Sequence, residues 1–271
     1  MDSSSGAMPS GPRYLRPVPT PLADILQEIE LLLAPGRFED YGPNGLQVPG
    51  PAEVSTLVSG VSAHAELFGL AAEEGAELVI VHHGLFWGSG PGTIDAALKR
   101  RLKLLFDADI ALAAYHLPLD AHPEFGNNAL LARELGADGL EPFALHAGEP
   151  IGFIAHLAGG GLSIGELTSR VAKATAREPL VFDAGPALVR RFGIVTGAGA
   201  DYLAEAAALG ADAFITGEAA ERTMAVARES GVHFLAAGHY ATERFGVRKL
   251  GEHLAERFGL RHTFLDVPNP V

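Results

Sequence analysis

Two adjacent histidines end an apolar run in the sequence LVIVHHG, residues 78–84. Successive side chains of a strand point to opposite faces, so His82 and His83 cannot share one partner while the strand continues. At the carboxyl end of the strand the two imidazoles can diverge, each facing a different atom. This arrangement suits a pair of metal ions about 3.5–4 Å apart. Two core histidines satisfied by hydrogen bonds are the alternative interpretation.

Two carboxylates each follow a histidine by four residues: Asp120 follows His116, and Glu243 follows His239. Both pairs come directly after an apolar segment that we expect to be a strand. If the intervening residues form a helix, positions i and i+4 share a face and can reach one site. Imidazoles together with a carboxylate that bridges two cations predict a dinuclear metal centre. Taken alone, each pair could instead be a surface ion pair or a helix cap.

Cysteine is absent from the 271 residues, which excludes disulfides, thiolate zinc sites, iron–sulfur clusters and cysteine nucleophiles. Any metal must therefore be held by imidazole nitrogens and carboxylate oxygens. Such ligands fit two divalent metal ions per chain, with Zn or Fe favoured and Mn, Co or Ni also compatible.

The net charge of −13 and the lack of a Lys/Arg run argue against a nucleic-acid surface. No apolar run approaches the ~20 residues of a membrane span. Residues 1–20 are rich in Ser, Gly and Pro and have no apolar segment typical of a secretory signal. We therefore expect a flexible tail at residues 1–20 and a cytoplasmic protein with no membrane partner.

The elements that position the histidines and carboxylates follow an alternating pattern of strands and helices. Such alternation predicts an α/β fold with a mostly parallel sheet flanked by helices, in which ligands collect at the carboxyl ends of the strands. A second alternating series begins near residue 191, and Ser163 with Glu166 fits a helix capping box. The first series comprises expected strands at 55–62, 76–83 and 110–116 and expected helices at 64–75 and 94–109.

The two series resemble each other. GAELVIVHHG at 75–84 is similar to GADAFITGEA at 210–219, and IALAAYHLPLD at 110–120 is similar to HFLAAGHYATE at 233–243. Two pairs of similar segments in the same order predict an internal duplication, with a first α/β part at 21–128 and a second at 129–271. The first part carries three candidate ligands and the second carries two, so the metal site is expected between the parts, at the carboxyl ends of strands.

Six motifs in order carry a resemblance to a known family. They are DYGPNGLQV, VHHGLFW, YHLPLDAHPEFGNN, AFITGE, AAGHYATERFG and DVPNP. Together they resemble the Nif-three-like dinuclear metal-centre family in its short bacterial form, over residues 22–270. Many members of that family are named GTP cyclohydrolase I type 2 homologues. The resemblance implies a dinuclear centre, two related α/β parts and a toroidal homohexamer. Matched residue by residue, the implied metal ligands are His82, His83, Asp120, His239 and Glu243.

For other residues near these motifs, the sequence leaves more than one interpretation open. His116 could orient a ligand, carry a proton or simply pack, and Glu218 could relay protons or be structural; these two are the candidate catalytic groups. His122 has the same two interpretations as Glu218. Asn44 and Gln47 could line a substrate pocket, although turn chemistry explains this segment equally well. Phe86 and Trp87 could wall the pocket or cover a subunit contact.

An open dinuclear site favours a metal-dependent hydrolase, because a bound cation lowers the pKa of water towards ~7. GTP cyclohydrolase-like ring opening of a nucleotide is one such reaction. The alternative is a non-catalytic metal-binding ring that buffers metal or serves as a regulatory or interaction assembly. A ring that encircles DNA conflicts with the acidic charge.

Overall fold

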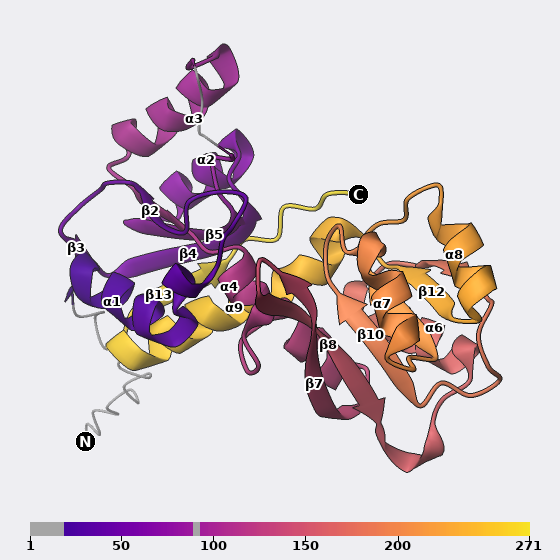
Figure 1. Ribbon diagram of the computed structural model, residues 1–271. Helices are drawn as coiled ribbons and strands as arrows, with labels where there is room; N and C mark the ends of the chain where they lie inside the picture. The colour runs from indigo at the N-terminus through magenta and orange to yellow at the C-terminus, as the bar shows by residue number, and fades with distance from the viewer. Residues whose placement is uncertain (1–18, 89–92) are drawn as a thin grey trace, which may run out of the picture.

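A computed structural model describes residues 19–88 and 93–271, so residues 1–18 of the tail expected at residues 1–20 lie outside the described part, whereas Thr20 pairs with Val54 in a short strand. Two lobes are visible in Figure 1, each built around a sheet with helices on its faces. The α/β class predicted from the sequence is confirmed. None of the described helices is both long enough and apolar enough to cross a membrane.

The sheet of the first lobe has five strands in the order β13-β4-β5-β6-β2. Its neighbours run parallel except at the edge, where β2 is antiparallel to β6. This sheet is therefore mostly parallel, as predicted. Its strands are β2 (Gly45–Val48), β4 (Thr56–Ser62), β5 (Leu78–His83), β6 (Ala111–Ala114) and β13 (Arg261–Phe264).

Both faces of the first sheet are covered by helices, which explains why residues 78–81 of β5 and all of β6 are apolar on both faces. In β5, Leu78 and Ile80 point into one core with α1 and α9, whereas Val79 and Val81 point into another with α2 and α3. This alternation follows from the two-residue period of a strand. The helices are α1 (Leu22–Leu33), α2 (Ala65–Glu73), α3 (Ala96–Asp107) and α9 (His239–Phe258).

The sheet of the second lobe has six strands in the order β7-β8-β10-β11-β12-β9. Only β10, β11 and β12 run parallel to one another; the other pairs are antiparallel. This sheet is mixed, because a long hairpin on one side and a short strand on the other extend its parallel centre. The strands are β7 (Ala137–His146), β8 (Glu149–Leu157), β9 (Leu180–Phe182), β10 (Arg191–Val195), β11 (Ala213–Thr216) and β12 (His233–Ala236).

Four helices cover the faces of the second sheet. One core forms beneath α5 and α6 and the other beneath α7 and α8. The predicted capping box of α6 is present, with Ser163 and Glu166 each accepting from the backbone N–H of the other. The helices are α5 (Asn127–Glu134), α6 (Ile164–Thr175), α7 (Leu203–Ala208) and α8 (Thr223–Ser230). The remaining short elements are β1 (Thr20–Pro21), β3 (Glu53–Val54), α4 (Leu117–Ala121) and the 3-10 turns η1 (Pro35–Arg37), η2 (Ala158–Gly160) and η3 (Ala200–Tyr202).

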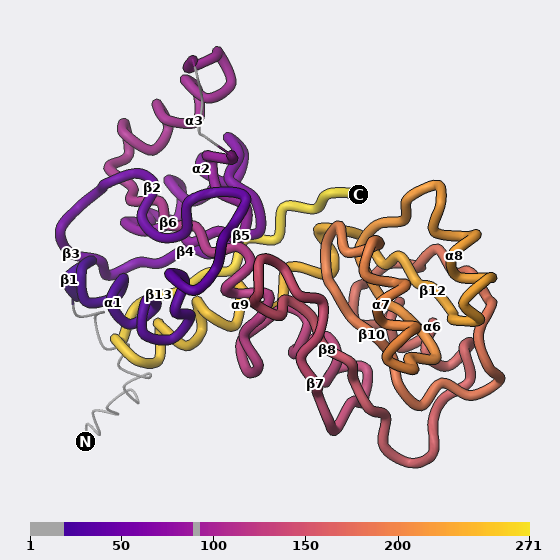
Figure 2. The backbone as a smooth tube through the Cα atoms, viewed as in Figure 1, coloured from indigo at the N-terminus to yellow at the C-terminus, as the bar shows by residue number. Residues whose placement is uncertain are grey.

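Helix α9 connects the lobes. It begins directly after β12 of the second sheet and extends under the first sheet, and β13 then pairs with β4 (Figures 1 and 2). The expected division at residue 128/129 therefore does not separate the two sheets along the chain, because the last strand belongs to the first one. The first sheet has four adjacent parallel strands and the second has three, and the internal duplication stays a prediction.

Candidate metal centre

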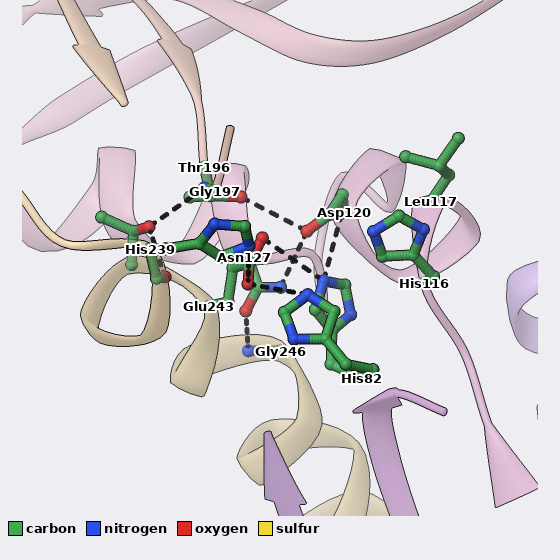
Figure 3. A network of polar contacts seen from close by, with 12 residues as sticks. His82, His116, Leu117, Asp120, Asn127, Thr196, Gly197, His239, Glu243 and Gly246 are labelled. Carbon is green, nitrogen blue, oxygen red and sulfur yellow. Dashed lines mark hydrogen bonds and ion pairs between the residues drawn. The ribbon is translucent and has the colours of Figure 1, made fainter. Parts of the chain in front are cut away.

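The candidate ligands lie at the ends of elements from both lobes. His82 and His83 end β5, Asp120 lies in α4, and His239 and Glu243 occupy the first two turns of α9. Gly238 precedes α9 with a φ of 94°, a conformation that suits glycine and lets the helix start immediately after β12. The structure thus brings together all five residues that the sequence singled out (Figure 3 shows four of them labelled).

Glu243 lies at the centre of the group. Its Oε2 is 3.1 Å from the Nε2 atoms of both His83 and His239, and its Oε1 is 3.6 Å from Nε2 of His82. Asp120 Oδ2 is 3.3 Å from the same His82 nitrogen. Three sets of side chains could each hold a cation. Two of them share Glu243, one with His82 and Asp120 and the other with His83 and His239, whereas the third consists of His82, His83 and His116.

Each imidazole is oriented through its Nδ1 atom, so that its Nε2 faces Glu243. His82 Nδ1 donates to the Tyr115 carbonyl at 3.0 Å, and His83 Nδ1 is 3.0 Å from the Ser62 hydroxyl. His239 Nδ1 donates to the Glu218 carboxylate. Such outer hydrogen bonds fix the ring and leave Nε2 as a metal ligand. Glu218 therefore lies beside the site and accepts a hydrogen bond from a candidate ligand, His239.

Neighbouring residues also position the carboxylates of Asp120 and Glu243. Asp120 Oδ1 accepts from Asn127 Nδ2 at 2.8 Å and from the Thr196 hydroxyl at 3.3 Å, which leaves Oδ2 facing His82. Gly197 has a φ of 66°, and a Cβ atom there would come 2.1 Å from Glu243 Oε1. The absence of a side chain at Gly197 therefore leaves room for the carboxylate.

The chemistry of these residues fits metal cations. His82 Nε2 and Glu243 Oε2 are buried and have no hydrogen-bond partner among the described residues. Leaving such an atom unsatisfied costs about 1–3 kcal/mol or more, so the pair is expected to have another partner. A cation in each set that includes Glu243 would satisfy both atoms, and nitrogen with oxygen ligands suits the borderline divalent metals.

The same geometry shifts the pKa values of the cluster. Burial lowers the pKa of His82, but Asp120 and Glu243 outweigh it and hold that pKa well above the ordinary value. Burial also opposes the rise in the pKa of His239 to about 9, which Glu243 and Glu218 cause. Burial dominates at His83 and lowers its pKa. Despite its burial, Glu243 has a pKa held well below the usual range by His83, His82 and His239.

His116 lies beside the cluster and belongs to a pair that the sequence did not reveal. Its Nδ1 donates to Asp40 Oδ1 at 2.7 Å, and its ring centroid is 5.0 Å from that of His82. The Asp40 side chain is 2% exposed and also accepts from Asn44 Nδ2 and the Leu117 N–H. Burial raises the pKa of Asp40, but these donors outweigh it and lower the pKa. Asp40 thus positions His116.

Asn44 and Gln47 brace loops around the site. Asn44 Oδ1 accepts from the backbone N–H of His116 at 2.8 Å, and Gln47 joins the Leu85 N–H to the Pro43 carbonyl. These bonds agree with the structural interpretation of the motif. His122 Nδ1 accepts from two backbone N–H groups of its own turn, at Glu124 and Phe125.

A cavity of about 520 Å³ opens over the cluster. His83, His116, Asp120, His239 and Glu243 all line it. Trp87 also lines the cavity, whereas Phe86 packs against the apolar core of the first lobe. Reactive groups bound in the cavity would therefore lie directly against the candidate ligands.

The comparison with known protein families gives a match over nearly the whole chain. The sequence model of the family Duf34/NIF3 (NGG1p interacting factor 3) matches residues 20–270. The chain belongs to this family.

Two similar proteins are each named GTP cyclohydrolase 1 type 2 homolog. The one from Pseudomonas aeruginosa is 45% identical over 252 residues, which cover 92% of this chain and 98% of the relative. The one from Escherichia coli is also 45% identical over 252 residues, with the same coverage. Among solved structures, protein ybgI, described as of unknown function, has a TM-score of 0.87 and 43% identity over 93% of this chain and 100% of its own. A protein from Thermus thermophilus has a TM-score of 0.85 and 38% identity, with the same coverage.

Proposed function

We propose that this protein is a metal-dependent hydrolase with two divalent cations per chain. One cation is held by His82, Asp120 and Glu243, the other by His83, His239 and Glu243. The observation that carries the proposal is the position of Glu243, which faces three imidazole Nε2 atoms at 3.1–3.6 Å beneath an open cavity. When bound, two such cations supply a Lewis acid and an activated water.

The chain itself supplies orientation and a proton carrier. Hydrogen bonds at Nδ1 hold the three ligand imidazoles with Nε2 towards Glu243. His116 lines the cavity, and because Asp40 accepts from its Nδ1, its Nε2 is available to accept or return a proton. The names of the relatives support ring opening of a nucleotide base as the reaction class.

The first test is the metal content per chain, measured by elemental analysis on protein purified without chelators. We expect close to two transition-metal ions in the native protein and large losses in His82→Ala and Glu243→Ala. His253→Ala is the matched control, because this histidine pairs with Glu28 away from the cluster. A native protein that stays metal-free after reconstitution would contradict the proposal.

The second test is turnover by the metal-loaded protein, with GTP, other nucleotides, phosphoesters and amides as substrates. Asp120→Ala serves as the inactive control, because it removes a carboxylate at one set of ligands. Activity of the native protein at the level of this variant for every substrate would contradict hydrolysis and leave only metal binding.

A further inference from the structure

We infer that the cavity binds a planar, uncharged heteroaromatic molecule of nucleobase or nucleoside size in preference to a nucleoside triphosphate. The inference rests on the proposed function, because it names the substrate class of the same site. It depends on the shape, the aromatic walls and the charge of the cavity.

The walls carry three aromatic side chains from three separate segments. Trp87 follows β5, Tyr41 lies in the loop before β2, and Tyr202 ends η3. The Trp87 ring centroid is 5.2 Å from that of His116 and 5.8 Å from that of His83. Trp87 is 43% exposed and Tyr41 is 57% exposed, so both leave aromatic surface free. Such surfaces bind flat rings by stacking.

The remaining lining is mostly apolar. Leu117, Ile151 and Val195 line the cavity, and the polar residues Asn128 and Thr196 line it as well. The volume of about 520 Å³ lies in the range of about 300–1,000 Å³ that small-molecule sites occupy. A ring system with few charged substituents therefore matches both the size and the lining.

The charges around the cavity disfavour a polyphosphate. Among the described residues, none that lines the cavity is Lys or Arg. Arg37 pairs with Glu149 at 2.6 Å, and Arg222, near Tyr202, pairs with Asp201. Cations at the cluster would face the reactive group, but a phosphate chain that extends away from them would find no guanidinium or ammonium group on the described walls. The net charge of −13 would repel it further.

The chain contains a single tryptophan, Trp87, so its fluorescence reports directly on the cavity. We would titrate the metal-loaded protein with guanosine, adenosine, uridine and pterin, and with GTP and ATP, exciting at the red edge of tryptophan absorption. Calorimetry would check each affinity. We expect at least one uncharged ring compound to quench Trp87, and its triphosphate, where one exists, to bind about tenfold more weakly or not at all.

Three variants test the aromatic wall. Tyr202→Leu should weaken binding of the ring compound about five- to tenfold, the scale of one stacking contact. Tyr202→Phe keeps the ring and should retain the affinity. Phe106→Leu removes an exposed aromatic ring on α3 that does not line the cavity, and it should have no effect.

Two outcomes would overturn the inference: a triphosphate that binds more tightly than its nucleoside, or no response of Trp87 to any ring compound. Metal analysis of the same sample distinguishes a failure of this inference from a failure of the proposed function. A fully metal-loaded protein that binds no ring compound contradicts the inference and leaves the metal centre standing. Ring binding by a protein that cannot take up metal supports the inference and contradicts the hydrolase.

Discussion

Glu243 is the residue on which both proposed sets of metal ligands depend. Its two oxygens face different imidazoles, whereas Asp120 faces only His82. The two carboxylates should therefore differ in what their loss removes. Both side chains are buried, so a difference in exposure does not explain this expectation. It follows from the number of imidazoles that each carboxylate faces.

Glu243→Gln should lose metal from both sets, because the amide keeps the size of the side chain but removes the charge that the cations share. Asp120→Asn should lose about one ion and keep the other. Elemental analysis measures both losses, and Glu252→Gln, a carboxylate on the exposed face of the same helix, is the control. Equal losses in the two variants would contradict a shared Glu243.

Asp40→Asn should lower turnover about 10- to 100-fold while the metal content stays unchanged, as expected for a residue that orients a proton carrier. Asp40 contacts His116 and no candidate ligand directly. The imidazole N–H resonance of His116, assigned by its loss in His116→Gln, should shift in Asp40→Asn. Asp107→Asn, which removes an exposed carboxylate on α3, is the control. A loss of metal in Asp40→Asn would instead make Asp40 part of the metal-binding structure.

At the scale of elements, Gly197 shows how tightly the loop after β10 approaches α9. Gly197 and Gly231 both have a φ of 66°, so an alanine is strained equally at either position. Only at Gly197 would the new Cβ atom meet a side chain, at 2.1 Å from Glu243 Oε1, whereas nothing lies within 4 Å at Gly231. A comparison of the two alanine variants therefore distinguishes the effect of backbone strain from the effect of displacing the Glu243 side chain.

Gly197→Ala should lower the metal content, whereas Gly231→Ala should keep it. Both variants should lose about 1 kcal/mol of unfolding free energy to the left-handed backbone, and Gly197→Ala should lose more, because Glu243 must also move. Urea unfolding and elemental analysis of the two proteins test this expectation. Full metal content in Gly197→Ala would show that the loop can move away from Glu243.

His262 in β13 gives the contact between β13 and α9 a pH dependence. It is 2.8 Å from the Ser59 hydroxyl, and burial lowers its pKa; Glu252 opposes this change and Arg248 adds to it. A histidine with a depressed pKa in the folded state costs stability as pH falls below its unfolded pKa of about 6.5, because the unfolded chain binds the proton first. We expect the difference in unfolding free energy between wild type and His262→Gln to shrink from pH 7.5 to pH 5.5. A constant difference in urea unfolding at the two pH values would contradict this.

The sequence predicted those parts of the centre that depend on local spacing. The paired histidines at the end of a strand and the helical pair His239 and Glu243 follow from the periods of two and 3.6 residues. Asp40 could not be found this way, because its partner His116 is 76 positions away and no local pattern links them. The mixed order of the second sheet and the return of β13 to the first sheet depend equally on long-range pairing, which periodicity does not encode.

At the scale of the whole molecule, the homohexamer implied by the resemblance stays a prediction. Light scattering coupled to size-exclusion chromatography should give about six times the chain mass of 28.3 kDa. The measurement should be made with and without metal, because a mass that depends on metal would connect the centre to assembly. A monomer under both conditions would contradict the expected ring.

The course of α9 makes the first lobe a discontinuous domain. Its chain leaves after Asp120, forms the entire second sheet between residues 137 and 236, and returns at His239. The departure and the return meet at the candidate ligands, where Asp120 and Glu243 both approach His82. A cation bound by both carboxylates would therefore act as a cross-link that closes a loop of about 120 residues. Since it binds only the folded chain, it would couple the unfolding of one lobe to that of the other.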